Sequence, residues 1–150
     1  MKNVTVLFGK KGVGKTFLAK SLSEVYRFPV IIDGPAASSK IDKFYFDQVM
    51  DHTDLIFIDD IPKIDFEEMV FRLFGELLVE RKYNTPFEMK SPRAIITIDC
   101  DKQFIAQFGG SINARCNFIH VMNKPKGIDG SRIETKKFLP ESFIPKKVEL

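Results

Sequence analysis

The sequence predicts an α/β fold, a three-layer sandwich with helices on both faces of a five-stranded parallel sheet. Three observations predict it. Five short runs are rich in β-branched and aromatic residues, these runs are apolar almost throughout rather than at alternate positions, and segments with helical periodicity separate them. A chain of 150 residues that is 44% hydrophobic can build the core of one ordinary domain.

The predicted strands are spread along most of the chain. They are "VTVLF" at 4–8, "PVIID" at 29–33, "DLIFID" at 54–59, "RAIITID" at 93–99 and "NFIHVM" at 117–122. Before the fourth strand, "VERKYNTPFEMKSP" has two short extended pieces around "YNTP", which predicts a β-hairpin.

Two helices are predicted between the strands. After the first strand, apolar residues recur at i, i+4 and i+7, at Leu18, Leu22 and Val25. A longer apolar stripe predicts a helix over 66–79, and Asp65 with Glu68 three residues later predicts a capping pair at its start.

Domain organisation follows from composition. We expect residues 1–123 to form the core and residues 124–150 to form a basic, weakly structured tail in which "RIETKKF" adds at most an edge strand. The tail holds seven Lys and Arg against four Asp and Glu, whereas the rest of the chain has 16 of each, so the net charge of +3 lies in the tail. A weak contact with a polyanion is expected there first.

Cysteine usage and hydropathy narrow the class of protein. Cys100 and Cys116 have no C-x-x-C spacing and no histidine at ligand spacing, which predicts two reduced core thiols and neither a zinc site nor a disulfide framework. No apolar run is long enough to be a signal segment or a membrane span. We expect a soluble intracellular protein of the cytoplasm that makes no membrane contact.

The stretch after the first strand carries the clearest motif. Gly9, Gly14, Lys15 and Thr16 satisfy G-x-x-x-x-G-K-[ST], with an apolar strand before the motif and an amphipathic helix after it. In such a loop the backbone N–H groups and the helix N-terminus hold phosphates, the lysine contacts the outer phosphates, and the hydroxyl can bind Mg²⁺. The predicted phosphate-binding residues are Gly9, Lys10, Lys11, Gly12, Val13, Gly14, Lys15 and Thr16, with Lys10 and Lys11 interpreted mainly as exposed solubilising side chains.

An acidic pair completes the predicted site. Asp59 and Asp60 follow the apolar run "LIFI" at the end of the third strand. Asp59 is predicted to hold Mg²⁺ together with Thr16, and Asp60 to polarise the attacking water as a general base. Two acids at this position favour hydrolysis over transfer to a bound acceptor.

With "GKKGVGKT", "LIFIDD", "VERKYNTPF" and "RAIITID" in this order, the chain resembles the ATPase domain of superfamily 3 helicases over about residues 4–122. The resemblance is greatest to the helicase part of replication initiator proteins of small single-stranded DNA viruses, phages and plasmids. It implies an AAA+-like P-loop NTPase sheet, for which we expect the strand order 5-1-4-3-2. It also implies ATP and Mg²⁺ as ligands and hydrolysis coupled to single-stranded nucleic acid.

The resemblance implies roles for two further residues. The family's strand after the hairpin ends in Thr, a small or apolar residue and an Asn that senses the γ-phosphate, and the matching residues here are Thr97, Ile98 and Asp99. A carboxylate at this position cannot donate a hydrogen bond to phosphate and is repelled by it, so slow hydrolysis is expected. Arg115 matches the arginine that reaches a neighbouring subunit's nucleotide in the family.

The resemblance also implies partners. In the family the hairpin lines the channel of a hexameric ring, and here Arg81, Lys82 and Tyr83 match its strand-gripping part. We therefore expect three kinds of partner: single-stranded DNA or RNA, further copies of this chain in a homo-oligomer of up to six subunits, and a replication protein. The family's nicking domain or helical bundle lies ahead of the core, whereas this chain opens on its first core strand, so the core itself or another chain must provide assembly.

Two other functions remain open. A nucleotide kinase shares the first motif and the parallel sheet, but it needs an acceptor pocket and a lid with several arginines, and no arginine cluster lies between the strands here. A nucleotide-dependent interaction or loader module for a larger replication protein would need no unwinding activity. Turnover without an acceptor separates hydrolysis from kinase chemistry, and the mass in solution separates the motor from the module.

Overall fold

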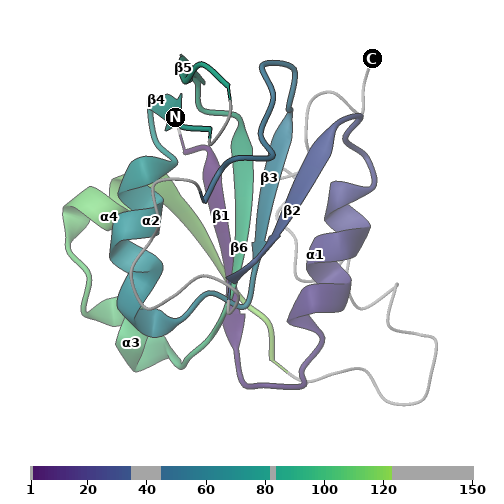
Figure 1. Ribbon diagram of the computed structural model, residues 1–150. Helices are drawn as coiled ribbons and strands as arrows, with labels where there is room; N and C mark the ends of the chain where they lie inside the picture. Colours follow the sequence, from purple (N-terminus) through teal and green to yellow (C-terminus); the bar gives the residue numbers. More distant parts are fainter. Residues whose placement is uncertain (1, 35–44, 82–83, 123–150) are drawn as a thin grey trace.

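The computed structural model describes residues 2–34, 45–81 and 84–122. Its centre is a sheet of five parallel strands in the order β2-β3-β6-β1-β7 (Figure 1). The strands are β1 (Val4–Gly9), β2 (Pro29–Asp33), β3 (Leu55–Asp59), β6 (Arg93–Asp99) and β7 (Cys116–His120). Each lies within one or two residues of a predicted strand, and the predicted α/β class with an all-parallel sheet is confirmed.

Helices lie on both faces of this sheet (Figure 1). α1 (Lys15–Ser23) packs on one face, where Leu18, Ala19 and Leu22 meet apolar side chains of β1, β3, β6 and β7. The other face carries α2 (Phe66–Arg72), α3 (Lys102–Ala106) and α4 (Gly110–Arg115), with the larger hydrophobic cluster beneath them. The central strands β1, β3 and β6 are buried on both faces because they have a core on each side, which explains their continuous apolar runs, whereas the edge strand β2 is largely exposed.

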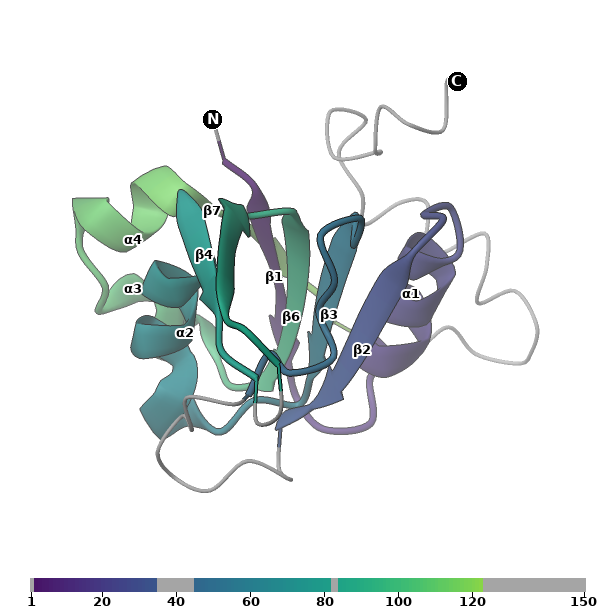
Figure 2. The same cartoon turned by 45° about the horizontal axis from the view of Figure 1, so that its top comes forward.

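A β-hairpin lies on the same face as α2. β4 (Glu76–Val79) and β5 (Phe87–Lys90) pair antiparallel and lie in front of β1 and β6 in Figure 2. Leu77 and Val79 are buried in the larger hydrophobic cluster, and Phe87 and Met89 pack against it. The predicted hairpin before the fourth core strand is therefore present, beginning three residues earlier than expected.

The helix predicted over 66–79 was too long. α2 ends at Arg72, and Gly75 follows with φ 82°, a left-handed conformation that glycine adopts at low cost. Leu77 fits the helical spacing of the apolar stripe, but it belongs to β4, where buried and exposed residues alternate as they do in a strand.

Three smaller expectations also need correction. The Asp65 side chain accepts no capping hydrogen bond, because its residue closes a short 3-10 turn, Lys63–Asp65, and has helical dihedral angles. Val25 lies beyond α1, which ends at Ser23. The short helices α3 and α4 between β6 and β7 were not predicted individually.

The two cysteines and the lengths of the helices bear on the remaining expectations. Cys100 and Cys116 are free and buried, and burial raises the pKa of their thiols to about 11 and about 12. Within the described part of the chain, no helix combines the length and the apolar character needed to cross a membrane. The predicted tail at 124–150, together with Lys82 and Tyr83, lies outside the described residues.

Candidate functional site at the carboxyl edge of the sheet

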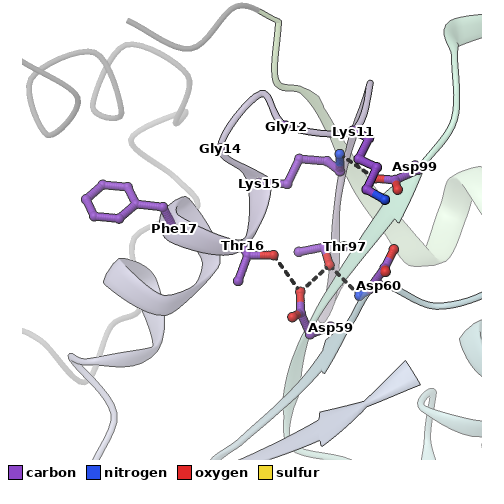
Figure 3. Close-up of a pocket in the computed structure, with 10 residues that line it drawn as sticks. All are labelled: Lys11, Gly12, Gly14, Lys15, Thr16, Phe17, Asp59, Asp60, Thr97 and Asp99. Carbon is purple, nitrogen blue, oxygen red and sulfur yellow. Dashed lines mark hydrogen bonds and ion pairs between the residues drawn. The ribbon is translucent and has the colours of Figure 1, made fainter. Parts of the chain in front are cut away.

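The parallel strands bring the predicted site together at one edge. In the sheet register Gly9 of β1 pairs with Asp99 of β6, and Asp33 of β2 pairs with Asp59 of β3, so the carboxyl ends of these strands meet. Open parallel sheets bind ligands at this edge. Here it carries a pocket of about 320 Å³ (Figure 3) lined by Lys11, Gly12, Gly14, Lys15, Thr16, Phe17, Asp59, Asp60, Thr97 and Asp99.

The loop from Gly9 to Gly14 needs its glycines for different reasons. A Cβ at Gly9 would collide with the carbonyl oxygen of Val121, so only glycine fits where β1 leaves the sheet. Gly12 and Gly14 have φ values of 86° and 101°, which other residues rarely adopt. Gly14 is also the N-cap of α1 and supplies no side-chain cap, so the first-turn amides of α1 are available to an anion at the pocket.

Lys15 is buried at the bottom of this loop, with 6% of its surface exposed. Its Nζ donates to the carbonyl oxygen of Lys10 at 2.7 Å and forms an ion pair with Asp99 Oδ1 at 2.6 Å. The side chain of Asp99 is 40% exposed and faces the pocket (Figure 3). The predicted γ-phosphate sensor is thus in direct contact with the predicted phosphate-binding lysine.

A chain of hydrogen bonds links α1, β3 and β6 on the other side of the pocket (Figure 3). The hydroxyls of Thr16 and Thr97 both donate to Asp59 Oδ1, at 2.9 and 2.8 Å. The backbone N–H of Asp60 donates in turn to Thr97 Oγ1 at 2.6 Å. Thr97 therefore fixes both acidic residues, and it is 1% exposed.

Sequence reasoning assigned no role to Thr97. It noted the residue only as part of the strand that ends at Asp99. A polar residue inside the otherwise apolar run "AIITI" was the signal that could have identified it, because a buried hydroxyl needs a partner.

Asp60 has an unusual backbone and an altered acidity. Its φ is 62°, a left-handed conformation that aspartate tolerates better than most residues and that turns the chain at the end of β3. Gly34 packs so closely on this turn that a Cβ there would lie 2.6 Å from the Asp60 carbonyl oxygen. Burial raises the pKa of the Asp60 carboxyl, and the negative charges of Asp99 and Asp59 raise it further. A carboxylate with a raised pKa is a better proton acceptor.

The pocket offers a magnesium ion only some of the ligands that it needs. The Thr16 hydroxyl and the Asp59 carboxylate are hard oxygen donors 2.9 Å apart, which suits Mg²⁺. Among the described residues no group of three or more His, Cys, Asp or Glu side chains could hold a metal by itself. A metal bound here would take its remaining oxygen ligands from water or from a ligand such as a polyphosphate.

Arg115 lies away from this pocket. It ends α4 just before β7, and Cys116 pairs with Val4 at the amino end of β1, whereas the pocket is at the carboxyl end. Its guanidinium lies 4.8 Å from the ring of Phe71 and 4.7 Å from that of Phe74, and it donates to Ser111. Arg115 cannot act on the nucleotide of its own chain, and its action on a neighbouring subunit stays a prediction.

Of the three residues predicted to contact nucleic acid, the structure describes Arg81. Its guanidinium lies over the Phe87 ring at 4.7 Å and donates to the Val49 carbonyl oxygen at 3.1 Å. These contacts tie the hairpin to the segment that precedes β3. Arg81 is half-buried and lies outside the pocket, and its contact with nucleic acid stays a prediction. Lys82 and Tyr83 lie outside the described residues.

Comparison with known proteins supports the fold. Two solved structures of the NrS-1 C-terminal region, both described as A-form apo structures, are similar to this chain. One aligns with a TM-score of 0.54 and 14% identity over 89% of this chain, and the other, of residues 305–718, with 0.55 and 16% over 90%. At such identity the likeness concerns the fold alone, and this chain spans only 33% of each of those chains. No protein-family model and no curated protein matches the sequence.

Proposed function

We propose that this protein is a Mg²⁺-dependent P-loop nucleoside triphosphatase that hydrolyses ATP. The observation that carries the proposal is the meeting of Lys15, Thr16 and Asp59 in one pocket, directly after a glycine-rich turn at the carboxyl edge of a parallel sheet. A buried ammonium, a hydroxyl paired with a carboxylate and the uncapped N-terminus of α1 together form a site for a metal-bound polyphosphate.

Each group has a distinct task in this proposal. The amides from Gly9 to Thr16 and the Lys15 ammonium bind the phosphates and offset their charge. Thr16 and Asp59 would hold Mg²⁺, which supplies charge neutralisation at the β- and γ-phosphates when bound. Asp60 accepts a proton from a water whose oxygen attacks the γ-phosphorus. The bond between that phosphorus and the β–γ bridging oxygen breaks, leaving ADP and inorganic phosphate.

Phosphate release from ATP tests the proposal, with Lys15→Ala and Asp60→Asn as variants. Lys15→Ala should abolish nucleotide binding, and Asp60→Asn should keep binding but lower turnover by about a hundredfold or more. Lys10→Ala is the matched control, because it removes an exposed lysine of the same loop but keeps the carbonyl that Lys15 contacts. Full turnover in Lys15→Ala would contradict the proposal, and turnover that requires an acceptor would favour a kinase.

We propose further that hydrolysis is coupled to single-stranded nucleic acid in replication, in the manner of a superfamily 3 helicase. Support comes from the resemblance of the motifs and from the hairpin before β6, whereas the likeness to the NrS-1 C-terminal region supports only the fold. Single-stranded DNA or RNA should raise the rate of phosphate release, and Lys82→Ala should remove that stimulation without changing the basal rate.

A nucleotide-dependent interaction module remains the second candidate. One observation favours it: the Arg115 guanidinium contacts two phenylalanine rings of its own chain. Mass in solution with a non-hydrolysable ATP analogue and an oligonucleotide separates the candidates. An oligomer supports the motor, and a monomer at all concentrations supports the module.

A further inference from the structure

The contacts of Lys15 suggest how the site distinguishes one nucleotide from another. A lysine ammonium has three N–H donors. Two of them are already directed at oxygen atoms of the chain, the Lys10 carbonyl at 2.7 Å and the Asp99 carboxylate at 2.6 Å. The ammonium that should bind phosphate is therefore largely satisfied before any ligand arrives.

The backbone holds Asp99 in this position, while its side chain keeps some freedom. Asp99 pairs with Gly9 in the sheet register, and the next residue, Cys100, donates its N–H to the Gly9 carbonyl oxygen at 3.1 Å. The base of the side chain is thus fixed beside the start of the phosphate loop. Its carboxylate is 40% exposed at the pocket, so it can turn away from Lys15 without unpacking the core.

Asp59 also lines the pocket, but its carboxylate makes different contacts from that of Asp99. It accepts hydrogen bonds from the hydroxyls of Thr16 and Thr97 and so belongs to the proposed metal side of the pocket. Asp99 is the carboxylate that the structure pairs with Lys15. An incoming phosphate that seeks the Lys15 ammonium meets the negative charge of Asp99 first.

The ion pair between Lys15 and Asp99 affects the binding of a diphosphate and of a triphosphate unequally. In loops of this sequence the lysine contacts the β- and γ-phosphates. A diphosphate needs one donor from Lys15 and can leave the ion pair with Asp99 in place. The γ-phosphate of a triphosphate needs a second donor, brings additional negative charge and must displace the carboxylate, which repels it and cannot donate to it.

We infer that Asp99 determines the preference of this site for nucleoside diphosphates over triphosphates, by competing with the γ-phosphate for Lys15. The inference rests on the proposed nucleotide site and deepens it. Asp99 is then a residue that opposes triphosphate binding, in contrast to the γ-phosphate sensor that the family resemblance implied.

The test is calorimetric binding of Mg·ADP and of a Mg-bound non-hydrolysable ATP analogue to the wild-type chain and to Asp99→Asn. The amide removes the charge, keeps the shape and can donate to phosphate. Asp99→Asn should tighten analogue binding by about tenfold, the size expected for removal of one partly exposed like charge, and should change ADP binding by less than about threefold. Asp33→Asn is the matched control, because it removes the same charge from an exposed residue at the same sheet edge, outside the pocket.

The ratio of the two dissociation constants is the decisive quantity, because a general effect on folding or charge changes both ligands alike. An unchanged ratio in Asp99→Asn overturns the inference while leaving the nucleotide site intact, since both ligands still bind. A ratio that changes equally in Asp33→Asn also overturns it. Failure of the wild-type chain to bind either nucleotide overturns the proposed function itself.

Discussion

At the scale of single residues, the Thr97 hydroxyl makes the hydrogen bonds that hold Asp59 and Asp60 in place. Thr97→Val keeps the shape and removes the hydroxyl that binds Asp59 and accepts from the Asp60 N–H. An unpaired buried N–H costs about 1–3 kcal/mol, and the Asp60 N–H is partly buried, so the free energy of unfolding should fall by about 1 kcal/mol, the lower end of that range. Turnover should fall as well, because Asp60 loses the contact that fixes its backbone.

Thr97→Ser is the control for this prediction, since it restores the hydroxyl without the methyl group. Denaturant unfolding and phosphate release should both recover most of the loss in the serine variant. A serine variant as impaired as the valine variant would show that the methyl packing matters and the hydrogen bonds do not.

Asp65 is a residue at which folding and pH are linked. The residue is 4% exposed, and among the described residues its Oδ2 has no hydrogen-bond partner. Burial raises the pKa of this carboxyl above its ordinary 3.8, and the charge of Glu68 raises it further. The folded state therefore binds the proton more tightly than the unfolded state, so stability falls as pH rises from the ordinary pKa through the raised one.

Asp65→Asn should accordingly stabilise the protein at neutral pH by about 0.5–2 kcal/mol, the usual size of a favourable single change. The gain should vanish below the ordinary pKa of aspartate, where the wild-type carboxyl is protonated in both states. Thermal unfolding at pH 7 and at low pH measures it. Glu68→Gln should give a smaller gain or none, because it removes only the secondary cause and also breaks the ion pair of Glu68 with Arg72. A gain in Asp65→Asn that is independent of pH would contradict the assignment.

At the scale of elements, the sequence predicted the strands well and the short helices poorly. All five core strands are apolar runs, and the central strands β1, β3 and β6 are buried on both faces, so a local pattern is enough to find them. α2 was overextended because Leu77 keeps the helical spacing beyond Gly75, and only the pairing of β4 with β5 shows that it belongs to a strand. α3 and α4 have five and six residues, too few for a helical period to emerge.

The sequence predicted those parts of the site that depend on residues close together in the chain. The glycine spacing identified the loop, and the strand-end position of Asp59 predicted its meeting with Thr16. The ion pair of Lys15 with Asp99 depends on the register of β1 against β6, which no local pattern contains. For the same reason the packing of Arg115 between Phe71 and Phe74 was not foreseen.

Arg115 also gives a prediction at the scale of elements, because it joins α4 to the end of α2. Arg115→Ala removes both ring contacts and the hydrogen bonds to Ser111, so the free energy of unfolding should fall by about 1–3 kcal/mol. Arg27→Ala, at an exposed arginine, should change it by less than about 0.5 kcal/mol. Chemical denaturation measures both. Lost turnover with unchanged stability in Arg115→Ala would instead indicate that the arginine acts on a neighbouring subunit.

At the scale of the whole molecule, the proposed ligand lies at one edge of the sheet that separates the two hydrophobic clusters. The pocket is lined by the ends of β3 and β6 and by the first turn of α1, and side chains of both strands enter both clusters. A nucleotide bound there should therefore stabilise both faces of the sheet together. Mg·ADP at a hundredfold excess over its dissociation constant should add about 2.7 kcal/mol to the free energy of unfolding. Calorimetry should show a single transition that moves upward with ligand concentration, and Lys15→Ala should abolish the movement. A transition that splits with ligand, with only part of the heat shifted, would mean that the two faces unfold separately.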